Sequence, residues 1–170
     1  MTKSLPHLLE WSDVPNARLR LVDWPDAEHM RQWKNTHKQS FFHKLDITPE
    51  QQSAWFAAYM KRPDDHNYAV EERVGERWEP VGLLAARMLD GTVDVYNVMR
   101  GQRTQANLVH MGQMLWRFCG DVARHYDQPI TCKVLINNPA ISWYLENGFS
   151  QLAQAEDHVV LCYQSKGASK

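Results

Sequence analysis

The residues with the clearest spacing for chemistry in this chain are Asn137 and Tyr144, which carry an amide and a phenol. Ala140 lies between them, and spacings of three and four residues place all three on one face of a helix. An amide can hold a ligand by hydrogen bonds, and a phenol can also donate a proton to a reacting group. The alternative interpretation is that Tyr144 only fills the core beneath a packing helix.

The segment that contains these residues predicts a strand, a short helix and a second strand. Residues 133–136 are mostly apolar and β-branched, which is typical of a buried strand. Asn138 stands where a helix N-cap belongs, and Pro139 occupies the first helical position, where its missing N–H costs nothing. Gly148 then predicts a left-handed stop, so the helix has about two turns and presents its face toward the end of the strand.

The same residues resemble a known signature. In register, Asn137, Ala140, Tyr144, Gly148 and Phe149 are similar to the N-x-x-A-x-x-x-Y-x-x-x-G-F pattern of the GNAT superfamily of N-acetyltransferases. The resemblance implies acetyl-CoA as the acyl-donor cosubstrate, with Asn137 contacting its pantetheine arm. It also implies that Tyr144, whose phenol has an ordinary pKa of about 10, is the general acid for the CoA thiolate.

The other elements follow the order of that superfamily over nearly the whole chain. Periodicity and turn signals predict strands at residues 18–22, 68–73, 78–88, 92–99, 130–136 and 159–162, and helices at residues 23–33, 48–61 and 108–122. The resemblance implies an α/β (α+β) class and the GNAT fold, in which about four helices flank a mixed, mostly antiparallel sheet of about six to seven strands. Residues 33–35 and 47–50 are also similar to the RimJ/RimL-like or PseH-like subgroup, whose members act on protein N-terminal amines and on amino-sugar nucleotides.

Length and composition suit one globular domain. The 170 residues, 44% hydrophobic and 23% charged, can bury a substantial core, and we expect a single domain over residues 1–170 with loose termini at residues 1–16 and 165–170. No apolar run approaches the roughly 18 residues of a membrane span, and the first residues lack the pattern of a signal peptide. We therefore expect a cytoplasmic protein without a membrane partner.

Charge and metal-binding residue types narrow the partners further. With 19 basic and 20 acidic side chains the formal charge is -1, which argues against a nucleic-acid binder. The three cysteines are too scattered for a disulfide frame, and the eight histidines show no pair at metal-ligand spacing, so we expect no metal. The expected partner is a small-molecule amine acceptor. The resemblance also allows a homodimer, because dimers are common among similar proteins.

The chain departs from the superfamily at the loop that binds the CoA pyrophosphate, which normally has the pattern Q/R-x-x-G-x-G/A. Counting along the sequence places the expected contacts at Asn107, Val109, His110 and Gly112. Only Gly112 keeps a usual glycine, and registers that start at Gln102, Arg103 or Gln105 match no better.

Larger side chains in this loop need not abolish phosphate binding, since the N–H groups and the helix dipole belong to the backbone. Arg103 can add compensating charge, although a solvated surface arginine explains it equally well. Two interpretations of different class follow. The chain is either an acetyltransferase with an altered loop or an acyl-CoA sensor or interaction module that has lost turnover.

By the same resemblance, acetyl-CoA lies where the strand at residues 92–99 separates from the strand at residues 130–136. Its pantetheine arm would extend one strand edge by backbone hydrogen bonds. The backbone at Asn97, Val98 and Met99 would hold the thioester, and an N–H group there would stabilise the oxyanion of the tetrahedral intermediate.

A general base is also expected, because a free alkyl amine is mostly protonated at pH 7 and attacks only when neutral. We choose Asp94 for this role, against the alternative that it is a solvent-facing strand residue. The other candidates are Tyr96, Glu71, Glu72 and His43.

The loop after the first helix is unusually aromatic, because it contains Phe41, Phe42 and His43. We expect these three residues to bind the acceptor, and simple packing is the alternative. The sequence thus favours direct attack of a primary amine on acetyl-CoA in a ternary complex. A small amine such as an amino-sugar nucleotide is the preferred acceptor. A protein N-terminus and a non-catalytic acyl-CoA-binding role are the alternatives.

Overall fold

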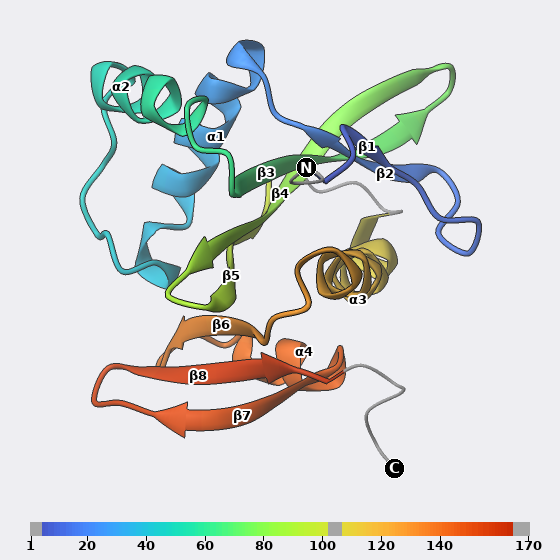
Figure 1. The fold of residues 1–170 in the computed structure, drawn as a ribbon. Helices are drawn as coiled ribbons and strands as arrows, with labels where there is room; N and C mark the ends of the chain where they lie inside the picture. Colours follow the sequence, from blue (N-terminus) through green and yellow to red (C-terminus); the bar gives the residue numbers. More distant parts are fainter. Residues whose placement is uncertain (1–4, 102–106, 165–170) are drawn as a thin grey trace.

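The computed structural model describes residues 5–101 and 107–164, and for residues 107–110 it describes the backbone alone. Within these residues eight strands form one sheet in the order β1-β2-β3-β4-β5-β6-β8-β7, and every neighbouring pair is antiparallel except β5 and β6 (Figure 1). The strands are β1 Leu8–Leu9, β2 Ala17–Leu21, β3 Asp65–Val74, β4 Arg77–Leu89, β5 Thr92–Arg100, β6 Ile130–Leu135, β7 Phe149–Gln154 and β8 His158–Tyr163. The α-helices are α1 Ala27–Thr36, α2 Pro49–Tyr59, α3 Asn107–Tyr126 and α4 Ile141–Glu146, with short 3-10 helices at Trp24–Asp26 and Lys38–Ser40.

The α/β (α+β) class with a mixed, mostly antiparallel sheet is confirmed, but the described sheet has eight strands where we expected about six to seven. The strand not expected is β1, a two-residue strand that pairs with β2. Residues 5–16 are packed rather than loosely held, because Leu5, Leu9 and Val14 are all buried in the main core. Residues 1–4 and 165–170, the outer parts of the expected loose termini, lie outside the described residues.

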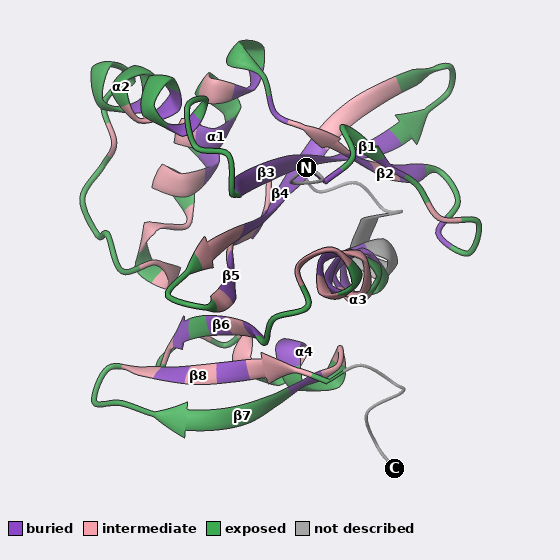
Figure 2. Cartoon of the chain, viewed as in Figure 1, coloured by how far each residue is buried: buried purple, intermediate pink, exposed green. Residues whose placement is uncertain are grey.

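The sheet is covered on both faces, as the alternation of side chains along its strands requires. On one face Ala69 and Leu83 pack with Phe56 of α2 in the smaller of two cores. On the other face Tyr68 packs edge-on against Phe118 of α3 in the larger core. Figure 1 shows α1 and α2 on one side of β3 and β4 and α3 on the other, and Figure 2 shows the exposed edge strand β7. No helix within the described ranges is long and apolar enough to cross a membrane.

Helix α2 begins where the sequence predicts. The Thr48 side chain accepts from the Gln51 N–H, the Gln51 side chain accepts from the Thr48 N–H, and Pro49 occupies the first turn, which together form the expected capping box. The buried face of α2 consists of Gln52, Phe56 and Tyr59, spaced four and three residues apart.

Helix α4 begins later than the sequence predicts. Pro139 and Ala140 form a turn, and the helix starts at Ile141, because Asn138 caps that turn instead of the helix: its side chain accepts from the Ala140 N–H at 2.9 Å. The predicted stop is confirmed, since Gly148 follows the helix with a φ of +96°.

Strands β5 and β6 are paired over only two residues, Val93 with Ile130 and Asp94 with Thr131. Beyond this point β5 continues beside β4, and β6 continues beside β8. A bulge in β5 accompanies the separation, since Asn97 and Val98 lie opposite the single residue Leu84, and Asn97 has a φ of +50°. Asparagine tolerates this left-handed conformation better than most residues, so the bulge is compatible with the sequence.

Gly148 should be required by packing as well as by conformation. A Cβ atom there would lie 2.0 Å from the Trp116 ring, whereas a Cβ atom at Gly75, which also has a positive φ, would meet nothing within 4 Å. Gly148→Ala should therefore lower the free energy of unfolding by about 1–3 kcal/mol more than Gly75→Ala does, the extra part being the cost of overpacking. Urea unfolding of both variants measures the difference, and equal losses would contradict the packing role.

Candidate functional site

Three neighbouring cavities open where β5 leaves β6. The β5–β6 cavity has a volume of about 320 Å³, and its lining includes Asp94, Val98, Cys132 and Tyr144. The α4 cavity, of about 250 Å³, lies against Met111, Trp143 and Tyr144. The α1–α2 cavity, of about 350 Å³, lies between the first two helices and β4 and β5. The three cavities adjoin one another around the bulge of β5, because they share lining residues such as Asn97, Val98 and Met99.

Tyr144 lies at the centre of this region. It is buried, lines both the β5–β6 cavity and the α4 cavity, and is held by ring contacts with Trp143 and Phe149. Burial, together with the neighbouring Cys132 thiol, raises the pKa of Tyr144 well above its usual value. The phenol therefore stays protonated at neutral pH and can donate a hydrogen bond to an anion that forms in the cavity. Tyr144 is thus both a member of the main core and a residue in the walls of two cavities.

Cys132 is unsuited to act as a nucleophile in this site. Burial raises the pKa of its thiol to about 12, so the reactive thiolate is scarce at neutral pH. Its position opposite Tyr144 makes it part of the apolar wall of the β5–β6 cavity.

The free edge of β5 faces the cavities with the residues that the resemblance selects. Val98 lines the β5–β6 and α4 cavities, Met99 lines the α4 and α1–α2 cavities, and Asn97 lines the β5–β6 and α1–α2 cavities. No strand of the described chain pairs with this edge beyond Asp94. The edge can therefore accept an extended ligand through backbone hydrogen bonds.

A chain of hydrogen bonds fixes the bulge of β5 from its buried side. The Asn97 amide donates to Asn67 Oδ1 at 3.1 Å, and the Asn67 amide donates to the Tyr96 hydroxyl at 2.8 Å. Tyr96 in turn donates to Asp65. At the Asn97 end of this chain of hydrogen bonds, Lys34 of α1 donates to Asn97 Oδ1 at 3.1 Å. Since buried polar networks hold their members in fixed positions when every member is paired, the backbone conformation at Asn97 is tied to both α1 and β3.

Asp94 is a buried carboxylate, which excludes the alternative of a solvent-facing strand residue. It accepts from Arg87 Nε at 3.0 Å, and the Arg87 guanidinium also lies over the Tyr96 ring at 4.0 Å. Burial raises the pKa of Asp94, and the attraction of Arg87 opposes this shift. A carboxyl group with a raised pKa that lines the β5–β6 cavity is suited to exchange a proton there.

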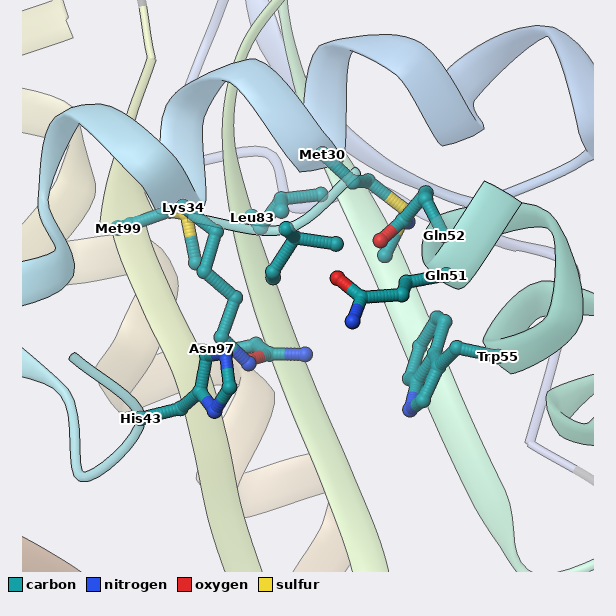
Figure 3. A pocket seen from close by; sticks show the side chains of 10 residues that line it. Met30, Lys34, His43, Gln51, Gln52, Trp55, Leu83, Asn97 and Met99 are labelled. Atoms are coloured by element: carbon teal, nitrogen blue, oxygen red, sulfur yellow. The ribbon is translucent and has the colours of Figure 1, made fainter. Parts of the chain in front are cut away.

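The α1–α2 cavity combines an apolar floor with a few polar groups (Figure 3). Leu83, Met99 and Trp55 supply apolar wall, while Lys34 descends from α1 toward Asn97 and Gln51 extends from α2 into the opening. Burial is the main cause that lowers the pKa of Lys34, and the Arg87 charge adds to it.

The aromatic loop lies over the same region. Phe41 lines the β5–β6 and α4 cavities and lies 5.3 Å below the Lys34 ammonium, while Phe42 lines only the β5–β6 cavity and is half exposed. His43 lines both the β5–β6 cavity and the α1–α2 cavity. The structure thus brings all three expected acceptor-binding residues to the cavities.

Several expected contacts lie elsewhere. Asn137 is exposed and is not among the residues that line the cavities, whereas its neighbour Asn138 lines two of them. Gly112 lies within α3 and faces α4, where a Cβ atom would come within 2.4 Å of the Asn147 side chain. Helix packing thus accounts for this glycine. The expected pyrophosphate loop is helical from Asn107 onward.

The remaining expected contacts cannot be placed at atomic detail. Asn107, Val109 and His110 belong to the first turns of α3, but their side chains are outside the described part of the chain. Arg103 lies outside the described residues entirely. Among the described side chains, no three or more of His, Cys, Asp and Glu gather at a point where they could hold a metal ion.

Among the cavity residues that sequence reasoning did not assign to the site are Lys34, Gln52, Trp55 and Arg87. Gln52 carries a readable signal, because it is a polar residue in the apolar four-and-three stripe of α2. The others have no such signal. Lys34 and Arg87 reach the site only because α1 and β4 lie beside β5 in the folded chain.

The sequence matches no protein-family model, and it matches no curated protein. The fold, in contrast, has clear counterparts among solved structures. One is apo FdhC, a nucleotide-linked sugar GNAT, at 14% identity and a TM-score of 0.69, with 87% of this chain and 86% of that chain covered.

A second is a spermidine N-acetyltransferase from Vibrio cholerae in complex with CoA and spermine, at 12% identity and a TM-score of 0.72, covering 90% of this chain and 97% of that one. A third is a probable acetyltransferase of the GNAT family from Chromobacterium violaceum, at 14% identity and a TM-score of 0.70, covering 98% and 90% of the two chains. These similarities show that the chain has the GNAT fold, as the sequence resemblance implied.

The stability of the protein should respond to Lys34 in a pH-dependent way. A lysine whose pKa is lowered on folding favours its neutral form in the folded state, so its stabilising contribution is present above the unfolded pKa of about 10.5 and is lost as pH falls through the folded pKa. Lys34→Met should therefore raise the free energy of unfolding at pH 7, and this gain should shrink as pH rises from the folded pKa toward 10.5. Lys44→Met, at an exposed loop lysine, serves as the control and should show no such gain. A pH-independent effect of Lys34→Met in urea unfolding would contradict this origin.

Proposed function

We propose that the protein is an acetyl-CoA-dependent N-acetyltransferase that transfers the acetyl group to a primary amine by direct attack in a ternary complex. The observation that carries the proposal is the unpaired edge of β5 facing a cavity in which Tyr144 is buried and protonated. Solved structures with the same fold include acetyltransferases, one of them in complex with CoA, which supports the same conclusion.

The residues present fit an acyl-CoA donor. Residues 95–99 of β5 pair with no described strand on this side, and their backbone would pair with the amide groups of the pantetheine arm, which acts as an additional strand. Asn138, which lines both adjoining cavities, is placed to contact the same arm in the role first assigned to Asn137. The start of α3 at Asn107 would direct backbone N–H groups toward the pyrophosphate, with Arg103 as a further proposed contact.

The chemistry requires three functions from this chain. A backbone N–H at Val98 or Met99 stabilises the negative charge that forms on the thioester oxygen when the amine nitrogen attacks the carbonyl carbon. Asp94 accepts the proton that the amine loses. As the carbon–sulfur bond breaks, Tyr144 donates a hydrogen bond to the sulfur and supplies its proton.

We further propose that the acceptor is a small amine, such as an amino-sugar nucleotide. The acceptor would enter through the α1–α2 cavity, whose residues Lys34, His43 and Asn97 also line the β5–β6 cavity and so connect it to Tyr144. FdhC, which is described as a nucleotide-linked sugar GNAT, offers a precedent on the same fold. The resemblance of residues 33–35 and 47–50 to the PseH-like subgroup points to the same substrate class, and the RimJ/RimL-like alternative, a protein N-terminus, is the runner-up.

A non-catalytic acyl-CoA-binding role is the second candidate, and the altered pyrophosphate loop favours it. The two candidates differ in one measurement. Thiol release from acetyl-CoA across amino sugars, polyamines, amino acids and N-terminal peptides reports turnover, and binding of acetyl-CoA without release from any acceptor would select the second candidate.

Tyr144→Phe should lower kcat by more than about tenfold and leave the affinity for acetyl-CoA nearly intact, because the ring packing remains while the hydroxyl donor is lost. Tyr163→Phe is the matched control, since Tyr163 also packs on Phe149 but lies outside the three cavities. Steady-state thiol release and titration with acetyl-CoA measure both quantities. Equal loss of turnover and affinity would identify Tyr144 as structural.

Asp94→Asn should lower kcat/KM at pH 7 by at least about tenfold and remove the acidic limb of its pH profile, if Asp94 is the base. Arg87→Gln keeps the carboxylate but removes the cation that opposes the effect of burial, so the pKa of Asp94 should rise and the limb should move to higher pH. A limb that persists unchanged in Asp94→Asn would place the base on another residue.

A further inference from the structure

Gln52 is a buried side-chain amide in the wall of the α1–α2 cavity. Only 7% of its surface is exposed, and within the described residues its amide makes no hydrogen bond. Figure 3 shows the amide group at the cavity, beside Met30 and above Gln51. A buried amide without a partner is costly for a folded protein, because the hydrogen bonds it made to water are not replaced. Because it lies in a cavity wall, its amide can form hydrogen bonds with whatever fills the cavity, whether water or a bound ligand.

Lys34 reaches the same cavity from the opposite helix. Its ammonium donates to one oxygen, Asn97 Oδ1, and lies over the Phe41 ring, yet no carboxylate of the described chain lies within ion-pair distance. An ammonium group has three donors, so two remain for a ligand. The nearby Arg87 charge repels Lys34 and adds to the demand for an anion.

Within the part of the chain that the structure describes, neither cavity offers an unpaired carboxylate to a cation. The described residues of the α1–α2 cavity include no aspartate or glutamate. The described lining of the adjoining β5–β6 cavity contains one carboxylate, Asp94, which is paired with Arg87. The same lining contains three basic side chains, those of Lys34, Arg87 and Lys133. The combined site therefore has an excess of positive charge, and a second ammonium group on the acceptor would meet repulsion.

We propose that the acceptor is an amine that also carries a carboxylate or phosphate, with this anionic group bound by Lys34 and its neighbouring polar atoms bound by Gln52. The inference rests on the proposed acetyl transfer and names the substrate class for that site. The amine would extend past Asn97 and His43, which line both cavities, toward Tyr144. Acceptors whose remaining groups are all cationic, such as polyamines, are excluded by the same charges.

Matched acceptor pairs test the charge directly. Thiol release with acetyl-CoA is compared for glucosamine 1-phosphate against glucosamine, and for phenylalanine against phenylalanine amide, with spermidine as the cationic probe. In at least one pair, the member that carries the phosphate or carboxylate should have a kcat/KM about tenfold or more above that of the member without it. The reason is that the second member cannot form the charge-assisted hydrogen bond to Lys34. The pair that shows the difference also identifies whether the site prefers a phosphate or a carboxylate. Equal use of both members, or preferred use of spermidine, would overturn the proposal.

Two variants test whether Lys34 and Gln52 cause the preference for an acceptor with an anionic group. Lys34→Met should lower kcat/KM for the member that carries the anionic group about tenfold more than for the member that lacks it, so that the preference between the two is abolished. Gln52→Met, of similar length, should lower kcat/KM for the preferred acceptor by about tenfold through KM, yet the protein should be no less stable to heat, because an unpaired amide is removed. A lower melting temperature for Gln52→Met would show that the amide has a structural partner and would count against the proposal.

A direct binding measurement separates this inference from the proposed function. Titration of the intact protein with glucose 1-phosphate and with glucose, followed by the fluorescence of Trp55 and the other tryptophans, needs no turnover. If no acceptor releases thiol but glucose 1-phosphate binds and Lys34→Met weakens its binding about tenfold or more, the anion site stands and the proposed transfer fails. If thiol is released but neither anionic acceptors nor glucose 1-phosphate depend on Lys34, the transfer stands and the anion site fails.

Discussion

The functional region of this protein depends on the early end of pairing between β5 and β6. Two residue pairs, Val93 with Ile130 and Asp94 with Thr131, hold the strands together. Beyond them each strand keeps a partner on only one side. A continuous sheet would fill this space with backbone hydrogen bonds and leave no room for a ligand. Where the strands separate, the phenol of Tyr144 lines two cavities, and residues 95–99 of β5 pair with no described strand on the side of β6. The β5–β6 cavity and the chemistry proposed for it depend on this separation.

The separation is maintained by polar groups that would be costly if left unpaired. A bulge at Asn97 bends β5 where it separates from β6. The Asn97 amide donates to Asn67, the Asn67 amide donates to Tyr96, and the Tyr96 hydroxyl donates to Asp65, so each of these polar groups has a partner. On the opposite side α4 packs closely on α3, because Gly112 and Gly148 leave room for Asn147 and Trp116. The open region is thus bounded by two rigid contacts and does not depend on loop conformation alone.

The sequence predicted the elements that are determined locally. The capping box at Thr48, the stop at Gly148 and the apolar stripe of α3 depend on neighbouring residues, and each is present in the structure. The start of α4 was predicted two residues too early, because Asn138 can cap a turn as well as a helix and only the tertiary structure selects between them. The tyrosine was recognised by its spacing, while Lys34 and Arg87 were missed since their role comes from contacts between α1, β4 and β5 that are distant in sequence. The sequence also contained no sign that Gly112, which we expected at the pyrophosphate, packs closely against Asn147, because this contact joins residues that are distant in sequence.

Asn97 belongs to both halves of the site, and this has a thermodynamic consequence. Its backbone forms the bulge that would face the proposed donor, while its side-chain oxygen accepts a hydrogen bond from Lys34, which would face the proposed acceptor. Whatever alters the position of Lys34 also alters the restraint on the strand that would receive the thioester. The two substrates are therefore expected to influence each other's affinity, and linkage requires that the influence be equal in both directions. One asparagine amide would in this way make the protein respond to the joint presence of its substrates rather than to each of them independently.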